Sequence, residues 1–171
     1  MMKTLVPTLL LAMSISLPVV ASPVCDEQFS MKQLHTMTSA YNFGKQYNLE
    51  YTLAAIVWQE SSAGLYNSRK EGDFLVKSPF HILLKTAYSR EGCKNDICRT
   101  LVRSRLKYDF DYAAQHAIDE ITFWSRPGRT WNQVMAHYNG GYSPNHNYPK
   151  LISSKIRYLK KCVRLESESW R

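Results

Sequence analysis

Apolar residues recur every three or four positions along most of this chain, which is the spacing of one face of an α-helix. In segment 51–60, Leu53, Ile56 and Val57 share such a face, and no glycine or proline interrupts the segment. Segment 110–124 carries a longer apolar stripe, formed by Phe110, Ala113, Ala114, Ala117, Ile118 and Ile121. No segment sustains the alternation of apolar and polar residues that marks a half-buried strand. The pattern therefore predicts an all-α or mostly α-helical protein.

Further helices are expected on the same grounds, over residues 31–41, 80–90, 97–106, 131–139 and 148–165. Asp109 and Thr130 precede two of the expected helices, and both residue types are good N-caps. The periodicity places Leu101, Trp131 and Leu151 on the buried sides of their helices.

Glu60 is the residue of segment 51–60 that stands out chemically. It ends an otherwise apolar segment, four positions after Ile56 and on the same inward face. A lone carboxylate at the edge of a core helix is costly to desolvate, so burial favours its un-ionised form. Such a group is a candidate general acid. The alternative is a helix-end glutamate that turns into solvent.

A second segment of interest ends the helix that starts at Thr130, and it stops on paired glycines. It reads Met135, Ala136, His137, Tyr138, Asn139, Gly140 and Gly141. Together with Glu60-Ser61, it resembles the lytic transglycosylase (SLT-type) family of the lysozyme-like superfamily. In that family a helix ends in Glu-Ser, a Gly-Leu-Met-Gln-type segment follows, and an Ala-Tyr-Asn-Ala-Gly segment closes the site.

The chain departs from the family pattern in the middle segment and in one insertion. Ser78 stands where the family has glycine, His81 stands where it has glutamine, and His137 is inserted after the alanine of the last segment. A neutral histidine can still donate one hydrogen bond and accept another, so His81 can replace the amide in gripping a sugar substituent. The alternative is a surface or helix-capping histidine.

The resemblance implies a lysozyme-like single domain that needs no cofactor. It implies cleavage of the β-1,4 bond between N-acetylmuramic acid and N-acetylglucosamine, with the muramic 6-hydroxyl as nucleophile and a 1,6-anhydro product. Glu60 would act first as acid and then as base, so one carboxylate suffices. By the same resemblance Ser61 would hydrogen-bond near the acid, Tyr138 would orient it or contact sugar, and Asn139 would hold the turn or a saccharide amide.

Two alternatives remain open at this stage. A lysozyme-type hydrolase (muramidase) needs a second carboxylate, for which Glu71 and Asp73 are the candidates in segment 68–73, expected to be a lengthened, charged loop. The second alternative is a non-catalytic peptidoglycan-binding protein that kept the fold, and the intact Glu60 disfavours it. The mass of the product separates the first alternative from a transglycosylase, because an anhydro end is lighter by one water.

The first 21 residues have the pattern of a signal peptide, which predicts that the protein is exported. Residues 1–21 combine Lys3 with an apolar run that ends in Val19, Val20 and Ala21, which suits a signal peptide cleaved before Ser22. Residues 22–171 then form one domain, located in the periplasm or outside the cell. The net charge of the full chain is +8, and removing Lys3 with the leader leaves +7.

A basic exported domain attracts anionic envelope polymers. The expected partner is therefore the peptidoglycan glycan strand, and no nucleic-acid-binding motif is visible in the chain. The resemblance further implies a monomer that opens the wall locally for a secretion, conjugation, pilus or phage machine.

Four cysteines in an exported protein favour disulfides. They allow three connectivities, of which we favour Cys93 with Cys98 across a short loop and Cys25 with Cys162 across the whole domain. A metal site is not expected, because no second cysteine or histidine pair accompanies the Cys93 to Cys98 spacing.

Overall fold

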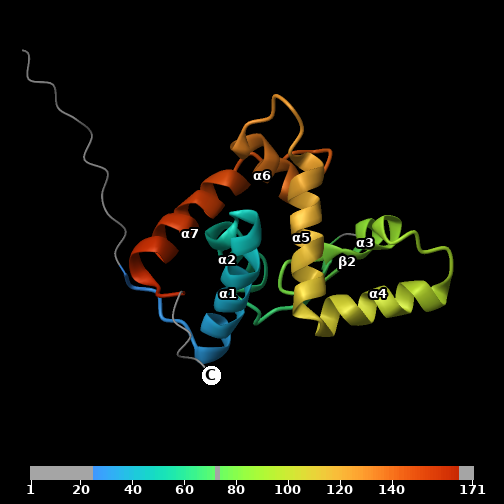
Figure 1. Ribbon diagram of the computed structural model, residues 1–171, viewed down its shortest axis with the longest axis horizontal. Helices are drawn as coiled ribbons and strands as arrows, with labels where there is room; N and C mark the ends of the chain where they lie inside the picture. The colour runs from blue at the N-terminus through green and yellow to red at the C-terminus, as the bar shows by residue number, and fades with distance from the viewer. Residues whose placement is uncertain (1–24, 72–73, 166–171) are drawn as a thin grey trace, which may run out of the picture.

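The computed structural model describes residues 25–71 and 74–165, and it is mostly helical, as the periodicity predicts (Figure 1). Its helices are α1 (Met31–Gly44), α2 (Glu50–Ser61), α3 (Leu84–Arg90), α4 (Asp96–Tyr108), α5 (Phe110–Trp124), α6 (Trp131–Gly140) and α7 (Tyr148–Cys162), with a single 3₁₀ turn, η1 (Lys45–Tyr47), after α1. The expected leader, residues 1–21, lies outside the described residues.

Helix α2 is the centre of the fold. Its residues from Thr52 to Val57 are all buried, and α1 and α7 pack against it. Helices α5 and α6 continue the core on the far side of α2, as Figure 1 shows. One cluster of buried side chains includes residues from all seven helices, for example Leu53 of α2, Leu106 of α4 and Ile152 of α7. Glu60, in the last turn of α2, therefore belongs to a helix that is held in the core by its buried residues.

The helix starts follow the capping signals in the sequence. Asp109 accepts a hydrogen bond from the backbone N–H of Tyr112 and so caps α5, as predicted. Thr130 caps α6 in a reciprocal capping box with Gln133, which satisfies two of the backbone N–H groups that every helix N-terminus leaves unpaired.

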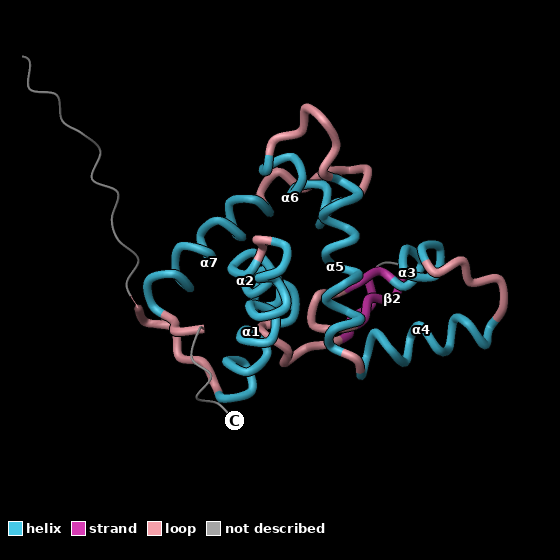
Figure 2. The backbone as a smooth tube through the Cα atoms, in the orientation of Figure 1, coloured by secondary structure: helices cyan, strands magenta, loops and turns pink. Residues whose placement is uncertain are grey.

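A small antiparallel sheet corrects the sequence-based expectation for segment 68–90. Strands β1 (Ser68–Glu71), β2 (Phe74–Lys77) and β3 (Ile82–Leu83) pair in the order β1-β2-β3 and lie against α3, α4 and α5 (Figure 2). Segment 68–71 is therefore a strand rather than a loop, and the helix predicted to start at residue 80 begins only at Leu84. Strands this short cannot display a period of two, and β1 is entirely polar, so the hydrophobic pattern carries no signal for them.

Three apolar residues predicted to face the core are instead substantially exposed. The exposed fraction is 60% for Leu101, 38% for Trp131 and 45% for Leu151. In α4 the buried face is made by Val102 and Leu106, and Leu101 lies about 100° around the helix from Val102. Adjacent apolar residues make the face ambiguous, and tertiary packing decides which of them is buried.

Both predicted disulfides are present. Cys25 pairs with Cys162, joining the segment before α1 to the last turn of α7, and Cys93 pairs with Cys98 at the start of α4. The first junction is reinforced by a 2.7 Å hydrogen bond from the backbone N–H of Glu27 to the hydroxyl of Tyr158. Over the described residues, no helix is long and apolar enough to cross a membrane.

Candidate active site

A left-handed turn directly after α2 fixes the position of Glu60. Ser62, Ala63 and Gly64 have φ angles of 51°, 56° and 85°. Within this turn the buried hydroxyl of Ser61 donates to the carbonyl of Val57 at 2.9 Å and accepts from the N–H of Gly64 at 2.8 Å. A side chain at Gly64 would begin 2.7 Å from the Thr36 hydroxyl, so the turn also needs a glycine for space.

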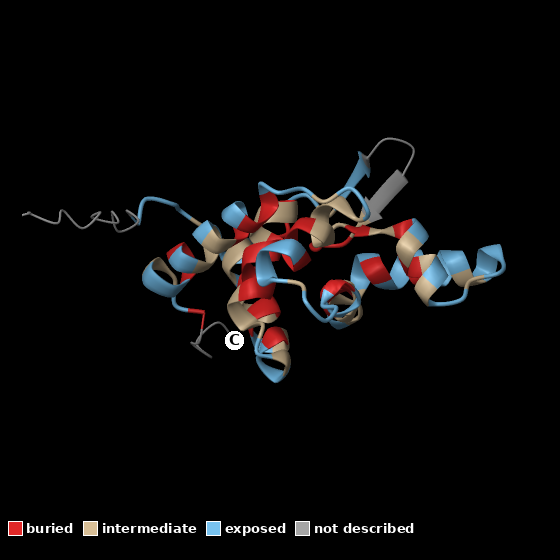
Figure 3. Ribbon diagram, turned by 90° about the horizontal axis from the view of Figure 1, so that it is seen from above, coloured by how far each residue is buried: buried red, intermediate tan, exposed pale blue. Residues whose placement is uncertain are grey.

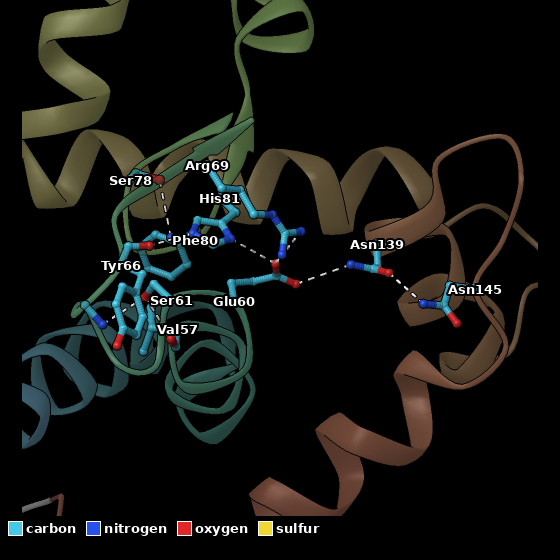
Figure 4. A network of polar contacts seen from close by, with 11 residues as sticks. Val57, Glu60, Ser61, Tyr66, Arg69, Ser78, Phe80, His81, Asn139 and Asn145 are labelled. Atoms are coloured by element: carbon cyan, nitrogen blue, oxygen red, sulfur yellow. Dashed lines mark hydrogen bonds and ion pairs between the residues drawn. The ribbon is translucent and has the colours of Figure 1, made fainter. Parts of the chain in front are cut away.

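Glu60 lines a cleft of about 230 Å³, and its side chain is only 6% exposed. The cleft takes its walls from α2, from the sheet and its turn, from α5 and from the end of α6. The other lining residues are Arg69, Phe80, His81, Ile82, Leu83, Thr86, Glu120, Tyr138, Asn139, Gly140 and Gly141. In Figure 4, Arg69 and His81 approach the carboxylate from one side and Asn139 approaches it from the other.

His81 belongs to the turn between β2 and β3, where its φ angle of 50° is left-handed. Its Nε2 lies 2.7 Å from the carbonyl oxygen of Tyr66, and its Nδ1 lies 3.4 Å from Oε2 of Glu60. A carbonyl oxygen only accepts hydrogen bonds, so Nε2 must carry a proton to contact it. Nδ1 is then the ring nitrogen that can either lack or carry a proton. A proton between Nδ1 and Oε2 satisfies both atoms, whereas without it two acceptors face each other.

Arg69 of β1 adds a positive charge to the same carboxylate. Its Nη2 lies 3.7 Å from Oε2 of Glu60, and its side chain is 45% exposed. Burial favours the neutral form of a carboxyl group, and a nearby guanidinium favours the charged form. The sequence indicated the apolar surroundings of Glu60 but not this guanidinium.

Asn139 contacts the other oxygen of Glu60. Its Nδ2 donates to Oε1 at 3.4 Å, and its Oδ1 accepts from Nδ2 of Asn145 at 2.8 Å. The Asn145 contact turns the Asn139 amide so that its N–H group points at the carboxylate. Gly140 allows this arrangement, because a side chain there would begin 2.6 Å from the backbone nitrogen of Asn145.

Tyr138 and Tyr148 stack on each other, with ring centroids 6.0 Å apart. Burial raises the pKa of both phenols well above the usual value, and the negative charge of Glu60 raises each pKa further. Both hydroxyls therefore remain protonated donors throughout the physiological range. The hydroxyl of Tyr138 is buried and has no hydrogen-bond partner within the described part of the chain, although Tyr138 lines the cleft.

Glu120 of α5 is a second carboxylate in the cleft, and sequence reasoning missed it. Its Oε2 accepts from Arg90 at 2.8 Å and its Oε1 accepts from the indole N–H of Trp124 at 2.6 Å. The signal was present, because Glu120 follows Ala117 by three positions and so borders the apolar stripe of α5. The side chain of Glu71 and all of Asp73, the carboxylates considered from sequence, lie outside what the structure describes.

The structure thus brings Glu60, His81, Tyr138 and Asn139 to one cleft, and it places Ser61 beneath the turn rather than in the lining. Among the described residues, no group of histidine, cysteine and carboxylate side chains is arranged to hold a metal ion. Comparisons with models of protein families, with curated proteins and with solved structures found no match.

Proposed function

We propose that this protein is a peptidoglycan lytic transglycosylase with a lysozyme-like fold, and that Glu60 is its catalytic acid. One observation carries the proposal: a buried carboxylate at the end of a rigid core helix lines a cleft and is contacted there by His81 and Asn139. Those contacts come from two other parts of the chain, and together they fix both carboxylate oxygens. Such fixed geometry is what general acid catalysis requires.

The first chemical step would be proton transfer from Glu60 to the glycosidic oxygen. An alkoxide is a poor leaving group, so protonation lowers the barrier to cleavage of the bond between that oxygen and C1 of the muramic residue. His81 supports this role because its Nδ1 lies 3.4 Å from Oε2, next to the group that would donate the proton. Asn139 would donate to the carboxylate that forms when the proton leaves.

In the second step the Glu60 carboxylate would accept the proton of the muramic 6-hydroxyl while O6 bonds to C1. This step closes the 1,6-anhydro ring and leaves Glu60 protonated again. The reaction therefore consumes no water and needs no second carboxylate. The phenols of Tyr138 and Tyr148 remain protonated, which lets them donate to the negatively charged carboxylate between the two steps.

A lysozyme-type hydrolase is the second candidate, and Glu120 is the observation that favours it. A second carboxylate in the same cleft is the group that would activate water or act as nucleophile. Both oxygens of Glu120, however, already accept hydrogen bonds from Arg90 and Trp124. Those contacts occupy the oxygens that would have to accept a proton from water or bond to C1 of the sugar. We therefore place the transglycosylase first and a non-catalytic peptidoglycan-binding protein last.

The proposed setting is the periplasm or the cell exterior, with peptidoglycan strands as substrate. The two disulfides are compatible with an oxidising compartment. The protein would act as a monomer that opens the wall locally for a secretion, conjugation, pilus or phage machine.

The test is to incubate the oxidised protein with purified peptidoglycan sacculi and analyse the soluble muropeptides by mass spectrometry. Anhydro-muramic ends, lighter by one water than reducing ends, are the expected result. Reducing ends would identify a hydrolase and direct attention to Glu120. Binding of sacculi without release would favour the non-catalytic alternative.

A further inference from the structure

The outer side of α4 carries an apolar stripe that is largely exposed in the described structure, although the ammonium of Lys107 lies 4.5 Å from the ring centroid of Tyr108. Ile97, Leu101 and Tyr108 have exposed fractions of 82%, 60% and 75%. Their spacing, with Ser104 between the second and third, places them on one helix face from the first turn to the last. We call these three residues the α4 stripe.

The fold holds the α4 stripe rigidly outward. Val102 and Leu106 anchor the opposite side of the helix in the core. The Cys93–Cys98 disulfide closes the loop that contains Ile97, and Asn95 caps the helix by accepting from the N–H of Cys98. Figure 1 shows α3 and α4 extending together away from the other helices, and in Figure 3 the far end of this extension is coloured mainly as exposed.

The segment that contains α4, residues 94–108, carries a strongly positive net charge. Residues 94–108 contain five basic residues and one acidic residue, a net charge of +4, which is half of the +8 of the whole chain. The basic residues are Lys94, Arg99, Arg103, Arg105 and Lys107, and all five are exposed. Arg99 pairs with Asp96, the one acid of the segment, at 3.3 Å, and Arg105 pairs with Asp109 at 3.5 Å. Positive charge remains in excess on both sides of the α4 stripe.

Exposed apolar residues flanked by positive charge limit the kinds of partner that can bind the α4 stripe. A second copy of this chain would bring two segments of +4 together, which like-charge repulsion disfavours. An anionic glycan or nucleic acid would pair with the cations but leave the apolar residues in water. A helix with apolar residues on one side and flanking cations is suited to the boundary of an anionic bilayer, where acyl chains take the apolar residues and headgroups take the charges.

We propose that the outer face of α4 docks on an anionic phospholipid surface, with the α4 stripe inserted at the level of the headgroups. This inference does not depend on the proposed catalytic function. None of the stripe residues lines the cleft of Glu60, so the two sites are formed by different residues. Combined with the proposed function, docking would confine the protein to the region of the wall that lies nearest the membrane.

The experiment is cosedimentation of the protein beginning at Ser22, with both disulfides formed, with vesicles of phosphatidylglycerol and phosphatidylethanolamine. Phosphatidylcholine vesicles serve as the neutral comparison. The test variant is I97S/L101S, and the control is L151S, which replaces an exposed leucine, 45% accessible, on the basic helix α7. Circular dichroism and the melting temperature establish that each variant is folded.

We expect the wild type and L151S to bind the anionic vesicles, and I97S/L101S to bind at least about tenfold more weakly because two apolar side chains are lost. Binding of the wild type should weaken when salt is raised, and neutral vesicles should bind little. Equal binding by I97S/L101S and the wild type would overturn the proposal and leave charge as the sole attraction.

Failure of the wild type to bind anionic vesicles would also overturn the proposal, and sedimentation equilibrium then decides between other occupants. A dimer that I97S/L101S abolishes would assign the α4 stripe to a second copy. A monomer that does not bind vesicles would indicate that the α4 stripe binds a different protein.

Discussion

The Nδ1 atom of His81 lies 3.4 Å from Oε2 of Glu60, while the Nε2 atom of the same ring is held at 2.7 Å by the carbonyl of Tyr66. The backbone thus fixes which ring nitrogen faces the carboxyl group. Under our proposal, an amide side chain occupies the corresponding position in other lytic transglycosylases. Here an imidazole does so, and unlike an amide it can exchange a proton with Glu60.

Replacing His81 by leucine is expected to lower kcat about 100-fold, within the usual range for a lost proton-transfer partner. His81→Gln retains a hydrogen-bonding amide and should keep more activity. Both variants meet the same left-handed backbone at φ 50°, so strain does not distinguish them. Steady-state rates on solubilised glycan strands, measured across pH, give the comparison. If both variants had the kcat and the pH profile of the wild type, His81 would have no role in the mechanism.

Asn145 acts on Glu60 only through Asn139, so its loss should be mild. Asn145→Ala frees the Asn139 amide to rotate and should reduce kcat about fivefold, which corresponds to the roughly 1 kcal/mol of one neutral hydrogen bond. Asn147→Ala is the matched control, because Asn147 is also exposed in the same loop and makes no side-chain cap for α7. A control that loses as much activity as Asn145→Ala would show that the loop as a whole, and not the amide contact, matters.

His116 should make the protein less stable in mild acid. Burial lowers the pKa of His116 below its ordinary value of 6.5, and the charge of Arg90 adds to this, although Glu91 and Asp119 act in the opposite direction. Because the unfolded chain then binds a proton more readily than the folded one, the unfolding free energy falls as the pH drops below 6.5.

The contribution of His116 to that fall is at most about 1.4 kcal/mol per pH unit, the value for one proton. His116→Gln should flatten the dependence, as measured by urea unfolding at about pH 7 and about pH 5. His35→Gln, at an exposed histidine of α1, should leave the dependence unchanged. A slope that is the same in wild type and His116→Gln contradicts the prediction.

The two disulfides should contribute unequally to stability. Cys25 and Cys162 are 137 residues apart, whereas Cys93 and Cys98 are separated by five. Under the chain-entropy model, serine substitution of the first pair should cost about 4 to 5 kcal/mol, and that of the second about 2 kcal/mol. Urea unfolding of the two double variants provides the values. A larger loss from the Cys93–Cys98 pair would mean that native-state effects outweigh loop entropy.

The sequence predicts the helices of this fold well, because their buried stripes are long enough to show a period. Asp109 and Thr130 also mark helix starts correctly. It does not predict the sheet, since β1 is polar and β3 is two residues long. The error at Leu101 has a similar origin, because two adjacent apolar residues leave the direction of the core undetermined until α5 packs on α4.

The candidate site was only partly predictable. Glu60 and Asn139 were found because each ends a helix in a distinctive local segment. Arg69 and Glu120 reach the cleft only through the sheet and through the packing of α5, and these depend on contacts between distant segments. Asn145 was also missed, because its role depends on the close approach that Gly140 permits.

The central claim is that Glu60 performs general acid catalysis on peptidoglycan, and the most direct test compares Glu60→Gln with Glu50→Gln on purified sacculi. Glu50 lies at the opposite end of α2 and does not line the cleft. We expect Glu60→Gln to bind sacculi like the wild type but to release muropeptides at least about 1,000-fold more slowly. Glu50→Gln should release anhydro-muropeptides at the wild-type rate. Undiminished release by folded Glu60→Gln would contradict the account.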